Sequence, residues 1–474
     1  MEWKPSKQSA LTYTQQIVQW FTERIHYGDF PIGMKCPSQR NLATQFEVNR
    51  STVNIALEEL KANGLIETRT GSGTFIAQNP WPHLLTQPKW QKQIDASIHK
   101  PNIDTIQLIN EYEQHPDFIR LGTGELAPEL LPTQQLEQSL RKIKIEPKAI
   151  GYSEPQGSFA LRKSLCMHLK KRGIETQPTN ILIISGALQA FQLIALGLLE
   201  RGSVIFQRQA SYLNSIHPFQ SAGMHMYSIQ NLPELKRTLE QVKRTRQGLF
   251  YAIPTLENPT GFVWSKEEKE YVYETCKSLR IPILEDDVYG ELLFDAPSSL
   301  PMKAHDASGQ ILYVGSISKT VSPGLRIGWI VGPEQVIQRL ADVKMQMDYG
   351  SSAISQAIVT HWLTTDIYDQ SILQLKKALQ LRASFMEQLL CTHFQQLATW
   401  ETPKGGFYIW LRFHKPCITK SLFTAMLEQK IIIHPGYVYM PNDLHHLRLS
   451  YAYATFEQME KAIKILAETI QQYV

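Results

Sequence analysis

The stretch SISKTVSPGLR, residues 316–326, carries the densest chemistry in this sequence and decides how the rest is interpreted. It places Lys319 three residues after Ser316 and seven before Arg326. A lysine that forms an imine must lose its proton, so it needs a desolvated or cation-rich pocket. Hydroxyl groups and a guanidinium nearby suit a phosphate dianion. The stretch therefore indicates a site for a phosphate-bearing carbonyl compound, although a lone lysine in such a loop is more often a surface residue.

An acidic strand end is the second signal. Asp286, Asp287 and Tyr289 follow an apolar run at 281–284 that has the length of a buried strand. α/β sheets place ligand groups at the carboxyl ends of their strands. A carboxylate there can hold a protonated ring nitrogen and keep the ring an effective electron sink. Asp286 is thus a candidate partner for a pyridinium nitrogen.

Two turns and an aromatic side chain complete the pattern. Asn258 opens the turn NPTG at 258–261 and can reach a phenolic oxygen. The turn SGALQ at 185–189 joins a predicted strand to a predicted helix and offers free amides to a phosphate. Tyr212 follows the next predicted strand and can stack on a ring. Each feature alone is common, and their combination in this order points to one cofactor pocket.

From about residue 116 the sequence alternates between apolar runs of strand length and helical stretches. This alternation predicts an α/β fold with a largely parallel sheet covered by helices. Roughly the last 130 residues hold longer amphipathic helices and few strands, which predicts a smaller C-terminal lobe. The runs predicted as strands are residues 181–184, 203–206, 248–252, 281–284 and 311–314.

The order of these motifs resembles the fold-type I aminotransferases of class I/II over about residues 118–474. The block that begins with YSEPQG at 152–157 is similar to that family as well. The resemblance implies pyridoxal 5'-phosphate as cofactor and Lys319 as its catalytic Schiff-base lysine. It implies that Asp286 bonds the pyridine nitrogen and that Asn258 and Tyr289 bond the ring oxygen. The implied phosphate ligands are Gly186, Ala187, Leu188, Ser316, Ser318 and Arg326, with Tyr152 reaching across from the other subunit.

Two further positions bear on that resemblance. Arg448, in HLRLS at 446–450, matches the arginine with which the family grips a substrate α-carboxylate, the alternative being a surface arginine on a strand. The stretch before Tyr212 departs from the family, which often has an acidic residue and a proline there. Gln207 and Ala210 stand in their place, so the stacking role of Tyr212 is weakened, while the other cofactor ligands are unaffected.

Residues 1–78 form a separate unit of three predicted helices and a hairpin. Two short strands, at 65–69 and 74–77, flank a glycine turn. This order predicts a winged helix-turn-helix, whose second helix enters the major groove of double-stranded DNA. Ser38 is placed to cap the first of the two short helices. Asn49 is placed to cap the second, and the first turns of that helix carry residues suited to base edges, namely Arg50, Ser51, Thr52 and Asn54.

Residues 10–78 resemble the GntR-type winged-helix repressors nearly throughout, from PSQRNLA at 37–43 to GSGTF at 71–75. The charge of this unit adds little evidence for DNA binding, because residues 1–78 hold eight Lys/Arg and seven Asp/Glu, a net charge of +1. From the pattern alone, a structural three-helix bundle without a ligand remains the alternative. The resemblance implies that DNA is faced by Ser38, Arg40, Arg50, Ser51, Thr52, Arg69 and Gly73.

The composition of the whole chain argues against a protein stabilised by disulfides or structural zinc and against a membrane-spanning protein. The length of 474 residues favours several domains. We expect a DNA-binding domain at 1–78, a linker that docks in places at 79–115, and an aminotransferase-like body at 116–474. Five widely spaced cysteines without a CxxC argue against disulfides and structural zinc and fit a cytoplasmic protein, and we expect no metal. We also expect no signal peptide and no membrane span, and a net charge of +4 is too mild to predict a partner by itself.

A GntR-type head fused to an aminotransferase-like body resembles the MocR/GabR-type bacterial transcription regulators. The resemblance spans nearly the whole chain. It implies a homodimer that binds DNA and that senses a small amino compound, or the level of pyridoxal phosphate, through an imine of Lys319. One alternative is an active aminotransferase with an accessory DNA-binding head. Another, a scaffold with a dead pocket, conflicts with the complete set of cofactor ligands.

Overall fold

The chain divides into two units, Met1–Ser97 and Ile98–Val474, in a computed structural model. The structure describes residues 3–7, 9, 11–26, 29–69, 71–77, 97, 102–143, 151–152, 154–243, 246–294 and 299–472. Most of the predicted linker, residues 79–96 and 98–101, lies outside the described residues. No helix in the described ranges is long and apolar enough to cross a membrane.

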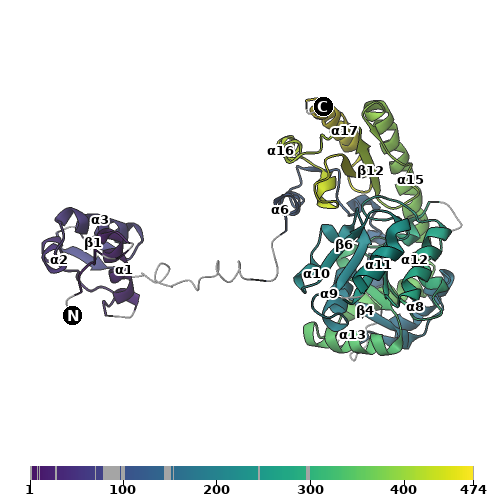
Figure 1. Ribbon diagram of the computed structural model, residues 1–474, viewed down its shortest axis with the longest axis horizontal. Coiled ribbons are helices and arrows are strands. Elements are labelled where there is room, and N and C mark those ends of the chain that lie inside the picture. The colour runs from purple at the N-terminus through teal and green to yellow at the C-terminus, as the bar shows by residue number, and fades with distance from the viewer. Residues whose placement is uncertain are drawn as a thin grey trace. The chain divides into compact units, whose positions relative to one another are not determined.

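The first unit is a three-helix cluster closed by a hairpin (Figure 1). Buried apolar side chains on the inner helix faces, among them Ile17, Phe46 and Val53, form its core. The strands pair antiparallel, with Ile66 opposite Ile76. Their turn needs glycine, because Gly71 and Gly73 have φ values of 75° and 111°. The elements are α1 (Tyr13–His26), α2 (Gln39–Phe46), α3 (Arg50–Ala62), β1 (Ile66–Arg69) and β2 (Gly73–Ile76).

The second unit is built on a seven-stranded mixed sheet. Only β10 runs antiparallel to its neighbours β4 and β9, and the remaining pairs are parallel. The predicted largely parallel sheet is therefore confirmed. In spatial order the strands are β4 (Ile181–Ile184), β10 (Gly328–Val331), β9 (Ile311–Ser316), β8 (Ile283–Asp286), β7 (Gly248–Ala252), β5 (Val204–Arg208) and β6 (His225–Ile229).

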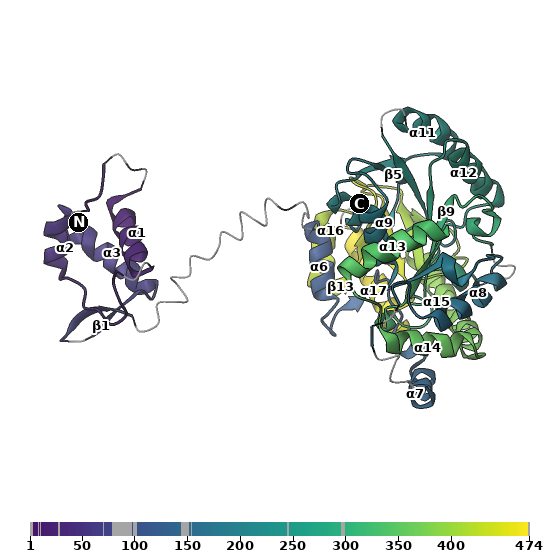
Figure 2. The same cartoon turned by 90° about the horizontal axis from the view of Figure 1, so that it is seen from below.

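Helices cover both faces of this sheet, because strand side chains alternate between two apolar faces. Leu182 and Ile184 of β4 pack with α9 (Ala187–Gly197) and α13 (Glu334–Met347), which lie side by side in Figure 2. On the other face, Ile181 and Ile183 pack with α8 (Phe159–Lys171) and α14 (Ala353–Leu363). Further along that face, the core includes α11 (Leu235–Lys243) and α12 (Lys266–Ser278).

A smaller C-terminal lobe follows, as predicted. Its four-stranded antiparallel sheet has the order β11 (Ala398–Thr399), β12 (Tyr408–Phe413), β15 (His446–Ser450) and β14 (His434–Pro435). The helices of the lobe are α15 (Ile367–Phe394), α16 (Lys420–Glu428) and α17 (Phe456–Ile470). The segment at 119–120 also joins this lobe, because β3 (Ile119–Arg120) pairs in parallel with β13 (Ile431–Ile432).

Part of the segment predicted as a linker is helical. Helix α6 (Asp104–Tyr112) buries Ile106 and Ile109. Ile109 belongs to the core of the C-terminal lobe, and both views show α6 beside α16 (Figures 1 and 2). Within the described residues, the second unit therefore begins before residue 116.

Candidate functional site

The DNA-facing residues predicted for the first unit lie at the starts of α2 and α3 and on the hairpin. Ser38 caps α2, its hydroxyl accepting a hydrogen bond from the Asn41 amide at 3.2 Å. Asn49 occupies the N-cap position of α3, but its side chain makes no capping hydrogen bond. Arg40, Arg50, Ser51 and Asn54 are exposed and Thr52 is half-buried.

A polar contact joins the two short helices. The Gln39 side-chain amide donates to Asn54 Oδ1 at 2.9 Å. On the hairpin, Arg69 pairs with Glu67 at 2.7 Å and lies over the ring of Phe75, while Gly73 is exposed. An exposed ion pair of this kind is worth about 1 kcal/mol or less. A phosphate group can therefore compete with Glu67 for the Arg69 guanidinium.

In the second unit, a cavity of about 430 Å³ lies where the carboxyl ends of β8 and β9 meet the C-terminal lobe. It gathers most of the predicted cofactor and effector residues into one space. Those lining it are Ala187, Leu188, Tyr212, Asn258, Asp286, Tyr289, Ser316, Ser318, Lys319, Arg326 and Arg448. A larger cavity of about 640 Å³ lies before the amino ends of β7, β8 and β9, and it contains none of the predicted site residues.

Lys319 follows β9 and projects into the cavity. Its Nζ donates to the Gly124 carbonyl at 2.6 Å and lies 5.9 Å from the ring centre of Tyr289. The Tyr289 hydroxyl is 3.0 Å from that of Tyr408. The amine is thus held among aromatic walls rather than on the surface.

Asp286, at the end of β8, is 2% exposed. Its Oδ2 accepts a hydrogen bond from the Tyr251 hydroxyl at 2.7 Å, whereas its Oδ1 is buried without a hydrogen-bond partner. Burial raises the pKa of Asp286 to about 6, although the Tyr251 hydrogen bond lowers it. An unpartnered buried carboxylate oxygen in a cavity suits a cationic N–H donor.

A tight turn and an arginine form the phosphate-sized end of the cavity. Gly186 precedes α9 with a φ of 92°. A Cβ atom at this position would lie 2.5 Å from the Arg326 guanidinium, so the close approach requires glycine. Arg326 donates to the Ser185 carbonyl at 2.6 Å, and the Ser316 and Ser318 hydroxyls are 3.0 Å apart. The free amides that begin α9, the hydroxyls and the guanidinium are donors that a phosphate accepts.

Arg448, on β15, is buried and also lines the cavity. It donates to Asn258 Oδ1 at 2.7 Å and to the Gly122 carbonyl at 2.6 Å. The guanidinium lies 4.1 Å and 4.7 Å from the ring centres of Tyr408 and Tyr439. Its Nε is buried without a hydrogen-bond partner. The predicted carboxylate ligand is therefore coupled to Asn258, the predicted ligand of the ring oxygen.

Two residues of the cavity near Arg448, namely His434 and Glu113, were not predicted from the sequence. His434 Nδ1 is 3.0 Å from Arg448 Nη2, and its Nε2 is 3.7 Å from Glu113 Oε1. Burial and the charge of Arg448 together lower the pKa of His434 to about 4, although Glu113 opposes this change. The neutral ring therefore accepts from Arg448 at Nδ1. Glu113 and His434 are 321 positions apart in the sequence. No local sequence pattern could therefore link the two residues.

Tyr152 does not lie in the cavity. Its side chain is 84% exposed and contacts the ring of Tyr349 at 5.2 Å between centroids. Tyr212 does line the cavity despite the unusual residues before it. Gln207, one of these residues, is fully buried and donates to Asn214 Oδ1 at 2.8 Å.

The residues present fit pyridoxal phosphate. The unpartnered Asp286 oxygen, the Lys319 amine and the amide turn beside Arg326 are complementary to a ring nitrogen, a carbonyl and a phosphate. In addition, no cluster of three or more His, Cys, Asp or Glu among the described residues could hold a metal ion.

Comparison with known proteins matches both units to families. Residues 116–466 match the model of the class I and II aminotransferases, and residues 13–76 match that of the bacterial regulatory proteins of the gntR family. Among solved structures, Pyrococcus horikoshii kynurenine aminotransferase aligns with a TM-score of 0.74 and 25% identity, covering 79% of this chain and 96% of that one. LysN, an α-aminoadipate aminotransferase from Thermus thermophilus, aligns with a TM-score of 0.71 and 24% identity, covering 81% and 98%.

Two curated relatives match nearly end to end. The uncharacterized HTH-type transcriptional regulator YisV of Bacillus subtilis is 43% identical over 99% of this chain and 98% of its own length. The HTH-type transcriptional regulator NorG of Staphylococcus aureus is 34% identical over 91% of this chain and 98% of its own length. The chain therefore belongs to the family in which a gntR-type helix-turn-helix head is fused to a class I and II aminotransferase body, as expected from its resemblance to the MocR/GabR-type regulators.

Proposed function

We propose that this protein is a transcriptional regulator that binds DNA through residues 1–78 and pyridoxal phosphate through a body at residues 116–474, with 79–115 as the linker. An amino compound, or the cofactor itself, is the signal. The observation that carries the proposal is the cavity in which Lys319, Asp286 and Arg448 meet, in a chain that also has a gntR-type head.

Each cavity residue has a defined task in this proposal. Pyridoxal phosphate, when bound, supplies an electrophilic carbonyl that reacts with primary amines. Asp286 holds the proton at the ring nitrogen, and Tyr212 stacks on the ring. Arg326 with the turn at 186–188, Ser316 and Ser318 binds the phosphate, and Lys319 presents its amine to the carbonyl. Asn258 and Tyr289 bind the ring oxygen.

Arg448 recognises a carboxylate on the effector. A guanidinium offers parallel donors to a planar carboxylate, and its Nε has no hydrogen-bond partner. An effector held by both Lys319 and Arg448 contacts the large sheet and the C-terminal lobe at once. Such a ligand favours whichever arrangement of the two parts it fits better, which is the physical requirement for a switch.

The names of the relatives support a regulatory role. YisV and NorG are both named HTH-type transcriptional regulators, and both match this chain over its head and its body. In the head, we propose that the residues at the starts of α2 and α3, together with Arg69 and Gly73, face double-stranded DNA. Because a regulator acts where the chromosome is, we further propose a cytoplasmic location.

We also propose that the protein is a homodimer. Tyr152 and Tyr349 are 84% and 63% exposed although their rings contact each other at 5.2 Å between centroids, tilted by 52°. A second copy that covers this pair would bring the Tyr152 hydroxyl toward the phosphate end of the partner's cavity. Sedimentation of the full-length protein, with Tyr152→Phe and Tyr349→Ala as variants, tests this arrangement.

A working aminotransferase is the second candidate function. The observation in its favour is that the predicted catalytic lysine, ring partner and carboxylate ligand are all present in one cavity. The aminotransferases that share the fold include one solved with PMP and kynurenine. In this case the head would be accessory and catalytic turnover the main activity.

One set of measurements separates the two functions. Full-length protein loaded with pyridoxal phosphate is titrated with a panel of amines and amino acids. Two quantities are recorded: its visible absorbance and its affinity for DNA from upstream of its own gene. The same panel is then tested for turnover with 2-oxoglutarate. A regulator changes its DNA affinity with one of these compounds at concentrations that give negligible turnover. Rapid turnover without any change in DNA affinity would support the enzyme instead.

A further inference from the structure

The end of β8 carries three consecutive acidic residues, Glu285, Asp286 and Asp287, all 4% exposed or less. Because strand side chains alternate, Asp286 lines the cavity while its two neighbours do not. Three adjacent buried carboxylates repel one another strongly unless each has its own partner. The structure provides a different partner for each neighbour of Asp286.

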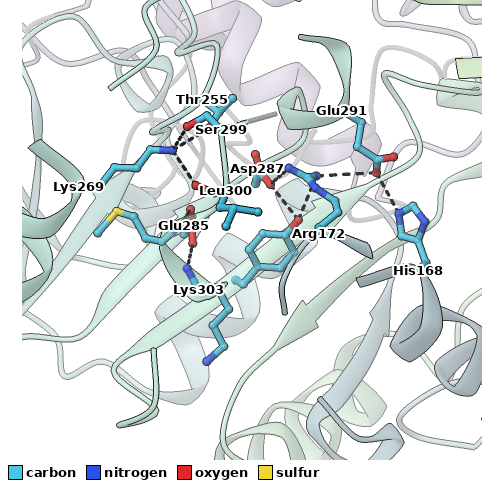
Figure 3. Close-up of polar contacts among 12 residues, drawn as sticks. His168, Arg172, Thr255, Lys269, Glu285, Asp287, Glu291, Ser299, Leu300 and Lys303 are labelled. Carbon is cyan, nitrogen blue, oxygen red and sulfur yellow. Dashed lines mark hydrogen bonds and ion pairs between the residues drawn. The ribbon is translucent and has the colours of Figure 1, made fainter. Parts of the chain in front are cut away.

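Glu285 is satisfied by main-chain amides. Its two oxygens accept from the amides of Met302 at 2.7 Å and Lys303 at 2.8 Å. The buried Lys269 lies on the same side, but its Nζ contacts the Ser299 hydroxyl and the Leu300 carbonyl rather than a carboxylate (Figure 3). Glu285 therefore needs no direct ion pair.

Asp287 is paired with an arginine. Arg172, which ends α8, lies 2.8 Å from Asp287 Oδ2, and the Tyr313 hydroxyl donates to the same oxygen at 2.9 Å. Figure 3 shows Arg172 between Asp287 and Glu291, with Glu291 in turn 3.0 Å from His168. Among the described residues, Arg172 is the one cation within ion-pair distance of Asp287.

The pair is closely packed. A Cβ atom at Gly290 would lie 2.1 Å from Asp287 Oδ1 and 2.5 Å from Arg172 Nη2. Only glycine leaves room for the two side chains at this position. Burial raises the pKa of Asp287, and the charge of Arg172 opposes that rise. Asp287 in turn acts to raise the pKa of Asp286.

We propose that Arg172 is a positioning residue for the cofactor: by neutralising Asp287, it lets the adjacent Asp286 carry the negative charge that a pyridinium nitrogen requires. This inference rests on the proposed binding of pyridoxal phosphate and assigns a role to a residue outside the cavity. Without Arg172, the uncompensated charge of Asp287 makes the adjacent Asp286 easier to protonate. Binding a pyridinium then requires Asp286 to give up that proton.

The test measures cofactor affinity in the full-length apoprotein. At about pH 5, below the pKa of about 6 of Asp286, Arg172→Met is expected to raise the dissociation constant for pyridoxal phosphate by about tenfold, because a further rise of about one in that pKa lowers the ionised fraction of Asp286 about tenfold. Combining it with Asp287→Asn removes the uncompensated charge and is expected to restore the affinity to within about threefold of wild type. A purely structural role for Arg172 would not be rescued in this way.

Two further variants complete the design. Arg172→Gln keeps donors but no charge, so it is expected to weaken binding as Arg172→Met does. Arg382→Met is the matched control, because the Arg382 side chain is 4% exposed, against 11% for that of Arg172, and pairs with Glu129 at 3.0 Å but lies in α15, outside the cavity. Circular dichroism and thermal melting of each apoprotein check folding independently of the cofactor.

The outcomes are distinct. Wild-type affinity in a folded Arg172→Met or Arg172→Gln protein would overturn the inference, as would a folded double variant that binds no better than Arg172→Met. If Arg172→Met does not fold, the cofactor affinity of Arg172→Gln tests the inference in its place. A wild-type protein that binds no pyridoxal phosphate would refute the proposed function itself.

Discussion

Arg448 offers the sharpest test of how a signal enters the protein. We predict that Arg448→Ala loses the response to a carboxylated effector while basal DNA binding is unchanged. In the structure, Nη1 and Nη2 each donate to a protein acceptor, and Nε is a buried donor without one. An effector carboxylate would gain charge-assisted hydrogen bonds from this group, each worth about 1.5–3 kcal/mol.

The magnitude follows from those bonds. Losing the bond from Nε costs about 1.5–3 kcal/mol, which is roughly a ten- to hundredfold increase in the effector concentration needed for half the response. Arg448→Lys retains a charge but not the planar fork, so we expect it to recover little. Asn258 also loses its 2.7 Å donor, so cofactor affinity is expected to fall by a few-fold at most.

The assay is the affinity of full-length protein for its DNA, measured at fixed salt over a series of effector concentrations. Salt must be matched because phosphate contacts make the affinity strongly salt-dependent. Arg412→Ala is the control, since Arg412 lies on the neighbouring strand β12, is exposed and does not line the cavity. An undiminished effector response in Arg448→Ala would refute the reasoning and show that the signal enters elsewhere.

Three further predictions concern the two binding sites. Borohydride should tether pyridoxal phosphate to wild type but not to Lys319→Ala, and a stable adduct in the variant, seen by mass spectrometry, would mean that another lysine reacts. Arg50→Ala should weaken specific DNA binding by about 1–3 kcal/mol without affecting cofactor binding, and unchanged affinity at matched salt would contradict this role. Because the pKa of Asp286 is raised to about 6, its carboxyl is protonated and neutral below that pH. Cofactor affinity, measured by titrating the apoprotein with pyridoxal phosphate at a series of pH values, should therefore fall as the pH drops through 6, and Asp286→Asn should bind weakly with a flatter pH profile.

The strands of the large sheet were largely predictable because they are continuous apolar runs. The predicted runs at 181–184 and 248–252 coincide with β4 and β7, and the other three overlap β5, β8 and β9. Two strands were not predicted, β6 and β10. β6 is an edge strand in which three of the five residues are exposed, and β10 is a four-residue strand that closely follows the loop carrying Lys319. Unlike β4, which is apolar throughout, β6 contains polar residues and β10 begins with glycine, so neither is a continuous apolar run.

The cavity was predictable only where the chemistry sits in local motifs. Lys319 and Asp286 each lie in a short, recognisable stretch. By contrast, the bond between Arg448 and Asn258 joins residues 190 positions apart, and the contact between His434 and Glu113 spans an even longer stretch of chain. Hydrophobic periodicity reports which face of an element is buried, not which distant side chain it meets. Glu113 also directly follows α6, in a segment whose polar composition favoured a linker.

The same contacts between distant residues bear on how an aminotransferase-like unit could regulate transcription. The cavity is lined by three separate parts of the second unit: the large sheet with Lys319, the C-terminal lobe with Arg448, and the segment of α6 with Ile109 and Glu113. A ligand that touches all three gains most when their spacing matches it, so its binding free energy depends on that spacing. Helix α6 is also the first described helix of the second unit, and the chain runs from it toward the head. We propose that ligand binding shifts α6 relative to the large sheet and the C-terminal lobe, a change that requires no alteration of the catalytic groups.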